Sequence, residues 1–220
     1  MKLLKQILDW SEVWALFIPL TVLAIRRKGV NTFLKPVVIY LFVAFVLNAY
    51  ADFTWQFQIT FHLPDWMKNN NFIYSIHFVA RLLLFSWFFI RLNEPYMTVV
   101  KKLIPVVFLI YVIINFFRSN PFTDFNSGAA AASAALLIVY CILHYLYLAQ
   151  QETALSTAKR AIGWVVAGLT IYQAESFFIY LFYTTLINSS LNFSIDIWSV
   201  HNIFFIIFCI FLAIALNEPD

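Results

Sequence analysis

Long apolar runs alternate with short polar segments along almost the whole chain. Six of the runs hold about 20 residues each, the length that a helix needs to cross the hydrocarbon core of a bilayer. The first run is shorter and ends in Arg26-Arg27-Lys28 without a small-residue cleavage site, which is typical of a retained span rather than of a signal peptide. We therefore predict seven transmembrane helices, at about residues 13–25, 35–56, 72–92, 99–117, 128–149, 161–184 and 196–216.

The composition agrees with this fold class. Apolar residues make up 63% of the chain and charged residues 11%, against about 45–50% and 25% in ordinary globular proteins. The surplus apolar surface must therefore face the lipid bilayer. Seven spans leave about ten residues for each loop and tail, which is too few for a soluble domain. We expect a single all-α polytopic membrane domain over residues 1–220.

Several function classes lack their sequence signatures. The chain has no Gly-rich phosphate loop, no nucleophile elbow, no His-Glu-x-x-His motif, and no lysine in the last apolar run for a retinal Schiff base. It also has no basic run of the kind that binds nucleic acid. We expect neither a nucleotide nor a retinal cofactor, and no nucleic acid as a partner.

The distribution of Lys and Arg predicts the orientation, because short cytoplasmic loops carry an excess of positive charge. With the N-terminus outside, four of these side chains fall on the outer side: Lys2, Lys5, Lys68 and Arg118. Nine fall on the inner side: Arg26, Arg27, Lys28, Lys35, Arg91, Lys101, Lys102, Lys159 and Arg160. We therefore predict a multi-pass protein of the cell (inner) membrane, with an outer N-terminus and a cytoplasmic C-terminus.

An internal repeat relates the third and seventh runs. Residues 73–95 align without a gap to residues 197–219, with 8 identities in 23 positions that include paired Ser, His, Asn, Glu and Pro. Such polar identities are not expected by chance in apolar helices. We predict two parallel three-helix repeats, at about residues 7–95 and 128–219, joined by a linker helix at about 99–117 and related by a pseudo-twofold axis along the membrane normal.

This three-one-three arrangement resembles the SWEET and PQ-loop transporters, a group that includes the KDEL-receptor type of cargo receptor. The Pro-Gln pair of that group is absent, since Pro19 is followed by Leu20 and the run 128–149 has no proline. The segment Asn70-Asn-Phe-Ile-Tyr74, which follows a run with an acidic residue near its end, also resembles small seven-span membrane proteins of Bacteroidota. The first resemblance implies transport, and neither implies a particular substrate.

Ionisable side chains inside the predicted spans mark the candidate site, because charge is rare and costly there. Asp52 near the end of the second run and His77 near the start of the third lie at matching depth. Glu175 and His201 are placed similarly in the second repeat. We therefore expect two acid–imidazole pairs that face one central axis in the outer half of the bundle.

Arg81 breaks the symmetry between the repeats, because the matching position is Phe205. It lies four residues after His77 on the same helix face. A guanidinium in the membrane needs a carboxylate partner, and the candidates are Glu175, Asp52 and Glu12. If no carboxylate fully neutralises Arg81, it would bind an anionic group of a substrate; a structural ion pair is the alternative. Three further polar residues extend the expected lining: Glu12, Asn48 and Gln173.

Three chemical roles are open for the acid–imidazole pairs. A carboxylate beside an imidazole makes a proton-binding site that can couple proton movement to solute movement. The set His77, His201, Asp52 and Glu175 would also suit a zinc ion. In the third role, each pair fixes the packing of its helices and does nothing else.

These roles correspond to three functions. A small-solute or proton-coupled transporter comes first, a non-catalytic receptor, sensor or accessory subunit second, and an intramembrane metal-dependent lipid hydrolase third, so we do not favour an enzyme. The small residues from Gly128 to Ala135 predict close helix packing, inside the bundle or against a second copy or a partner subunit. His144, which has no counterpart in the repeat, is interpreted as a core or interface residue.

Overall fold

A computed structural model describes residues 7–26, 29–57, 70–118, 125–150, 157–189 and 191–218 of the chain. Over this part of the chain the regular structure is helical and no strand occurs. The helices are α2 (Ser11–Trp14), α3 (Phe17–Ile25), the 3-10 turn η1 (Thr32–Leu34), α4 (Lys35–Phe57), α5 (Asn71–Arg91), α6 (Thr98–Arg118), α7 (Ser127–Ala149), α8 (Thr157–Leu181), α9 (Tyr183–Ser189) and α10 (Leu191–Asn217).

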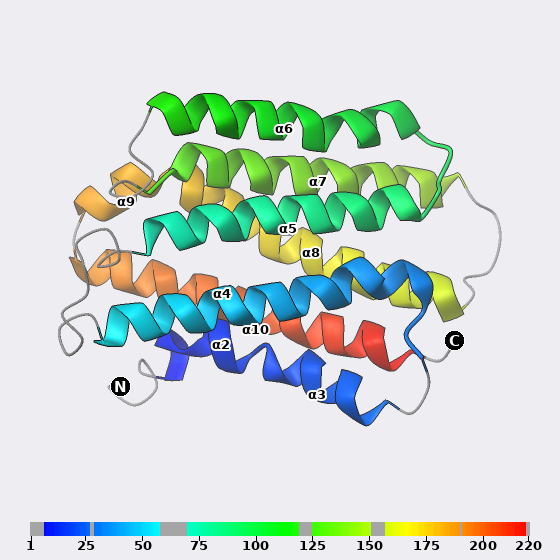
Figure 1. Cartoon of the computed structure of the whole chain (residues 1–220), viewed down its shortest axis with the longest axis horizontal. Coiled ribbons are helices and arrows are strands. Elements are labelled where there is room, and N and C mark those ends of the chain that lie inside the picture. Colours follow the sequence, from blue (N-terminus) through cyan, green and yellow to red (C-terminus); the bar gives the residue numbers. More distant parts are fainter. Residues whose placement is uncertain are drawn as a thin grey trace.

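The described helices confirm an α-helical protein whose composition suits a membrane. Six of them are long and apolar enough to cross a bilayer: Thr32–Phe57, Asn71–Arg91, Thr98–Arg118, Ser127–Ala149, Lys159–Leu181 and Ile197–Asn217. The stretch Ser11–Ile25 is apolar but shorter. The long helices lie side by side along one direction, as Figure 1 shows.

The first predicted helix is broken rather than continuous. α2 ends at Trp14 and α3 begins at Phe17. Pro19 explains the break, because a proline ring clashes with the carbonyl group four residues earlier, which here belongs to Ala15. That carbonyl instead accepts a hydrogen bond from the Ile18 amide at 3.1 Å, three residues on. The break leaves α2 as a separate short turn beside α4 and α10.

Helix α6 lies at the edge of the bundle, where it contacts α5 and α7 (Figure 1). Its outer side chains, such as Val99, Leu103 and Phe117, are apolar and exposed. Helices α4 and α5, α8 and α10, and α7 and α8 pack as neighbours, and α10 also contacts α3. The predicted linker helix is therefore peripheral, and the other long helices enclose the core.

The small-residue face of α7 is buried inside the chain. Ala129, Ala130 and Ala134 have no exposed surface. The Ser133 hydroxyl, also fully buried, donates to the main-chain carbonyl of Phe78 on α5 at 3.2 Å. Small side chains thus let α7 approach α5 closely. These buried residues therefore serve packing within the bundle, which is one of the two roles expected for this stretch.

An aromatic layer crosses the centre of the bundle. It consists of Tyr40 on α4, Phe85 on α5, Tyr172 on α8 and Phe208 on α10, all buried. The Tyr40 and Phe85 ring centroids are 4.9 Å apart, and the Tyr172 and Phe208 rings stack at 5.2 Å. Phe208 lies 6.0 Å from Phe85, which joins the two pairs. Rings from four helices therefore meet in one buried layer.

A tyrosine replaces a helix hydrogen bond that Pro105 removes from α6. Pro105 has no amide proton, so the Lys101 carbonyl four residues earlier loses its usual helical donor. The hydroxyl of Tyr140 on α7 donates to that carbonyl. Neighbouring helices commonly satisfy the backbone groups that a proline frees in a membrane helix.

We expect Tyr140→Phe to lower the free energy of unfolding by about 1–3 kcal/mol, since it leaves the buried Lys101 carbonyl without a donor. Unfolding in mixed micelles with increasing denaturant measures the change. The matched control is the same substitution in a Pro105→Ala background, where the alanine amide restores the helical donor and the loss should be smaller. An equal loss in both backgrounds would contradict this role for Tyr140.

Candidate functional site

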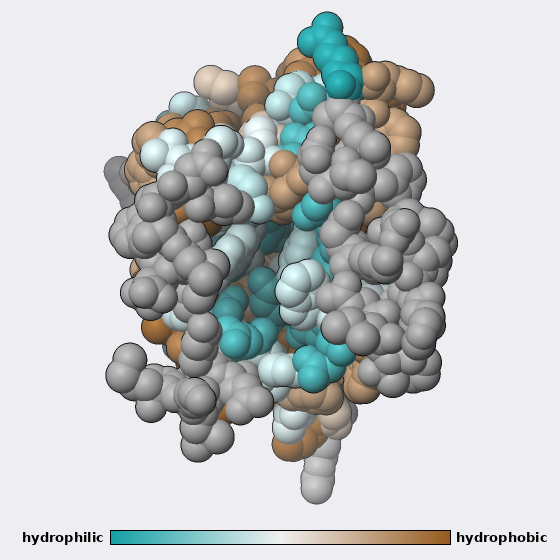
Figure 2. Space-filling view, turned by 90° about the vertical axis from the view of Figure 1, so that its left-hand side faces the viewer, coloured by the Kyte–Doolittle hydropathy of each residue, from teal (hydrophilic) through white to brown (hydrophobic). Residues whose placement is uncertain are grey.

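A polar cavity of about 810 Å³ opens at the end of the bundle where α4 finishes and α5 begins. Figure 2 views this end and shows a hollow with hydrophilic residues gathered inside it. Residues from α2, α4, α5, α8, α9 and α10 line the cavity. Six residues singled out in the sequence are among them: Glu12, Asn48, Asp52, His77, Arg81 and His201.

Polar contacts connect one predicted acid–imidazole pair to Arg81. The Glu175 Oε2 atom and the His201 Nδ1 atom are 3.0 Å apart, which agrees with the predicted pair. The His201 Nε2 atom lies 3.4 Å from the Tyr172 hydroxyl. That hydroxyl accepts a hydrogen bond from the Arg81 Nη1 atom at 3.0 Å. The four residues form a chain of contacts in which Glu175 and Tyr172 of α8 lie on either side of His201 of α10, and Tyr172 contacts Arg81 of α5.

The chemistry of these groups fixes the proton positions when His201 is neutral. Glu175 as a carboxylate only accepts, so His201 carries its proton on Nδ1 and donates it to Glu175. The bare Nε2 atom then accepts from the Tyr172 hydroxyl, whose oxygen accepts from Arg81. A proton added to Nε2 would make that nitrogen a donor, and the Tyr172 hydroxyl would have to turn. The protonation of His201 and the contact to Arg81 are therefore linked through one hydroxyl.

Arg81 has no carboxylate partner among the described residues, in contrast to what its place in a membrane helix predicted. Its side chain is 2% exposed, and no acidic oxygen of a described residue lies within 4.0 Å of the guanidinium. The guanidinium instead lies over the Tyr172 ring, 5.3 Å from the centroid, and its Nε atom has no hydrogen-bond partner. Tyrosine oxygen and ring electrons thus take the place of the expected direct ion pair.

The second expected pair is not formed. Asp52 and His77 both line the cavity, but Asp52 Oδ2 and His77 Nε2 have no hydrogen-bond partner in the described structure. The His77 ring instead stacks on Tyr40 of the aromatic layer, with centroids 6.2 Å apart. Both side chains therefore present unpaired polar atoms beside the cavity.

The broken first helix brings Glu12 to the cavity. The Asn48 side chain donates to the main-chain carbonyl of Glu12 at 2.9 Å, and Asn202 on α10 donates to that of Leu8 at 2.9 Å. The Tyr74 hydroxyl donates to the Glu12 carboxylate at 3.4 Å. Two amide side chains thus anchor the segment around α2 between α4 and α10.

Gln173 does not line the cavity, although we expected it to. It is fully buried, and neither polar atom of its amide has a hydrogen-bond partner in the described part of the chain. Tyr172 was missed by the sequence reading, because tyrosine is common in membrane helices. A signal exists in retrospect: Tyr172 lies three residues before Glu175, so both point along the same face of α8.

A metal site is not assembled from the described residues. No group of three or more His, Cys, Asp or Glu side chains among them is placed to hold an ion. His77, His201, Asp52 and Glu175 therefore do not form the four-ligand set that zinc would need. The metal-dependent hydrolase has no support from this geometry.

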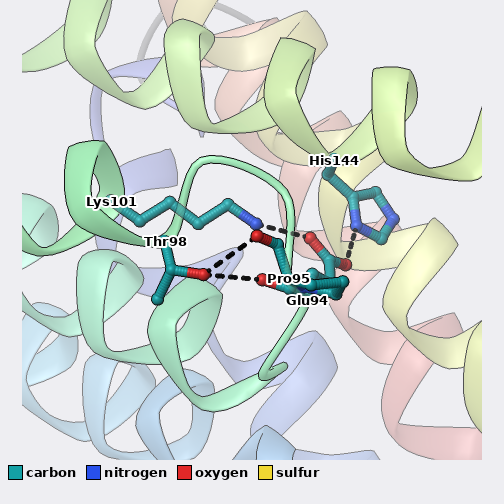
Figure 3. Close-up of polar contacts among 5 residues, drawn as sticks. All are labelled: Glu94, Pro95, Thr98, Lys101 and His144. Carbon is teal, nitrogen blue, oxygen red and sulfur yellow. Dashed lines mark hydrogen bonds and ion pairs between the residues drawn. The ribbon is translucent and has the colours of Figure 1, made fainter.

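A second ionic centre lies at the opposite end of the bundle (Figure 3). Glu94, between α5 and α6, is 7% exposed and accepts a hydrogen bond from the Lys101 Nζ atom at 2.7 Å. Its other oxygen lies 2.6 Å from the His144 Nδ1 atom on α7. His144 is thus a core residue, as interpreted from the sequence, but it also belongs to a buried ion cluster that joins three helices.

The partners of Glu94 set its protonation. Burial by itself raises the pKa of this carboxyl, but the hydrogen bonds from His144 and Lys101 and their charges outweigh it, so the pKa lies below the ordinary 4.5. The repeat-related residue Glu218 is placed differently. It lies 3.5 Å from Arg160, whose side chain is half exposed.

Comparison with protein-family models, with curated proteins and with solved structures finds no match.

The Glu94 cluster predicts acid-sensitive stability. The pKa of this carboxyl is lower in the folded protein than in the unfolded protein, where it lies near 4.5. Its contribution to stability is therefore complete at pH values above the unfolded-state pKa, and it is lost as the pH falls through the folded-state pKa. We expect Glu94→Gln to lower stability near pH 7 by about 3 kcal/mol, because Lys101 stays buried without a counter-charge.

Melting temperatures of the wild type and Glu94→Gln between about pH 7 and pH 3 measure this effect, and the gap between them should narrow below the ordinary carboxyl pKa. Glu218→Gln is the matched control, because its partly exposed pair contributes little. A gap that stays constant down to pH 3 would contradict the assignment of the acid sensitivity to Glu94.

Proposed function

We propose that this chain is a membrane transporter for small solutes and that an anionic group of the solute binds at Arg81. One observation carries the proposal: a buried guanidinium lines a cavity of about 810 Å³ with no carboxylate of the described residues within 4.0 Å. Arg stays charged in proteins and prefers bidentate contact with carboxylate or phosphate. A ligand anion would supply the charge that the protein itself leaves out.

The closed side of the cavity supports transport rather than a pore. Arg81 and Tyr172 reach the cavity, whereas Phe85 lies one helical turn beyond Arg81 in the aromatic layer. The Glu94 cluster lies further along the same direction. A solute could leave on the far side only if the helices moved and opened both layers. Such one-sided access is the starting state of an alternating-access cycle.

Proton coupling is the second part of the proposal. Glu175 and His201 form an acid–imidazole contact of 3.0 Å, and Tyr172 connects it to the guanidinium. Protonation of His201 would turn the Tyr172 hydroxyl and so change the contacts of Arg81 with a bound anion. This is a direct physical route from a bound proton to solute affinity.

Helix neighbours also support the proposed duplication. α4 packs on α5 as α8 packs on α10, and α5 contacts α7 as α10 contacts α3. Two related three-helix units would produce these equivalent contacts. We propose that the units rock about the cavity, with the cavity facing outside and the N-terminus on the same side, as in the three-one-three transporters that the topology resembles.

The role of Arg81 is tested by thermal stabilisation of the purified protein with a panel of carboxylates, phosphates and amino acids. At least one compound should raise the melting temperature of the wild type, and Arg81→Gln should weaken its binding about tenfold or more, because a charge-assisted contact is lost. Arg91→Gln, an exposed position on the same helix, is the matched control. Equal binding by both variants would contradict the assignment.

Uptake of the same compound into proteoliposomes then distinguishes a transporter from a receptor that only binds the compound. Flux that depends on Arg81 supports the transporter. Arg81-dependent binding without flux would overturn transport and favour the receptor that the sequence left as the alternative.

Coupling is tested with Tyr172→Phe, which keeps the ring under Arg81 and removes the hydroxyl. We expect uptake to persist at a reduced rate and to lose most of its response to a pH gradient across the vesicle. Glu175→Gln and His201→Ala should reduce that response in the same way, whereas Tyr145→Phe, at an exposed position on α7, should not. Wild-type pH response in all three site variants would contradict the proton route.

A further inference from the structure

We infer that the solute is a zwitterion whose ammonium group binds at Asp52 and Glu12 while its anionic group binds at Arg81, with the two charges several bonds apart. This inference rests on the proposed binding site. It follows from an arrangement in which one cavity holds two poles of opposite charge that are not paired with each other.

The acidic pole lies near the mouth of the cavity. Asp52 on α4 and Glu12 on α2 both line the cavity, and no Lys or Arg of the described residues lies within 4.0 Å of either carboxylate. Asp52 Oδ2 is buried without a hydrogen-bond partner. The Glu12 carboxylate accepts a hydrogen bond from the Tyr74 hydroxyl at 3.4 Å. Neither carboxylate is in direct contact with a Lys or Arg of the described residues.

The basic pole lies deeper and is an independent observation. Arg81 is 2% exposed, and its Nε atom has no partner. His77 is 8% exposed, and its Nε2 atom has no hydrogen-bond partner in the described structure. Both side chains line the same cavity. One cavity thus holds the unpaired Nε donor of Arg81 and the unpaired oxygen of Asp52, which suits a ligand that carries both kinds of charge.

A simple anion or cation fits this cavity less well. An anion that reaches Arg81 must pass the acidic pole, and like charge repels it where water is scarce. A simple cation would satisfy Asp52 and Glu12 but would leave Arg81 without an anion in direct contact. A zwitterion is attracted at both ends and enters with its anionic group first.

Helix geometry sets the spacing of the two charges. Tyr74 contacts Glu12 and lies seven residues before Arg81 on α5, which is about 10 Å along the helix axis. The Arg81 side chain leans toward the start of the helix and shortens this gap. An α-amino acid carries both charges on one carbon and is too short. A dipeptide or a headgroup with phosphate and ammonium groups has the required separation.

Binding of dialanine to purified protein in detergent tests the inference. N-acetyl-dialanine lacks the ammonium group, dialanine amide lacks the carboxylate, and alanine has both charges on one carbon. We expect dialanine to bind at least about tenfold more tightly than each of these probes. Asp52→Asn should weaken dialanine about tenfold and leave N-acetyl-dialanine unchanged, whereas Arg81→Gln should weaken both.

Each remaining outcome has a defined meaning. N-acetyl-dialanine that binds as tightly as dialanine through Arg81 would overturn the zwitterion and leave anion binding intact. Dialanine that binds through Asp52 and Arg81 without being taken up into vesicles would keep the zwitterion and overturn transport. In another outcome dialanine fails to bind, but phosphatidylethanolamine stabilises the wild type more than phosphatidylglycerol does. If this lipid stabilises neither Asp52→Asn nor Arg81→Gln, a lipid headgroup supplies the same pair of charges. Failure of dialanine and of the lipid alike overturns the inference.

Discussion

The buried guanidinium of Arg81 constrains the rest of the structure. It cannot lose its proton, and a charge among membrane helices needs either a partner or water. The chain provides a tyrosine hydroxyl and ring from α8, and a water-accessible cavity on the other side. Helices α5, α8 and α10 must therefore lie close together at this level, and the cavity cannot be filled by packing alone.

Two polar centres at opposite ends of the bundle are separated by apolar rings. Both carboxylate oxygens of Glu94 are paired, with Lys101 and His144 on separate helices. The cavity, in contrast, contains several polar atoms without partners. A paired cluster joins helices and resists their separation, whereas unpaired groups are available to a ligand. The two ends of the bundle therefore differ in how far their polar atoms are satisfied.

The two aligned segments, residues 73–95 and 197–219, share Ser, His, Asn, Glu and Pro positions but differ at Arg81, which aligns with Phe205. Glu94 is buried in an ion cluster, whereas Glu218 contacts the half-exposed Arg160. Residues that match in the sequence alignment thus have different surroundings in the structure.

Apolar run lengths in the sequence determined the membrane class and the positions of six long helices, because backbone hydrogen bonding in lipid leaves helices as the simplest solution. They did not predict the break at Ala15, which depends on Pro19 inside a short apolar run. Spacing along the chain also selected six residues that line the cavity, since intramembrane charge is rare. Only the tertiary structure decided the partners of the polar residues: Tyr172 lies beside Arg81, and His144 lies beside Glu94. Such pairs join helices that are far apart in sequence, and the periodicity of each helix says which face is polar but not what lies opposite.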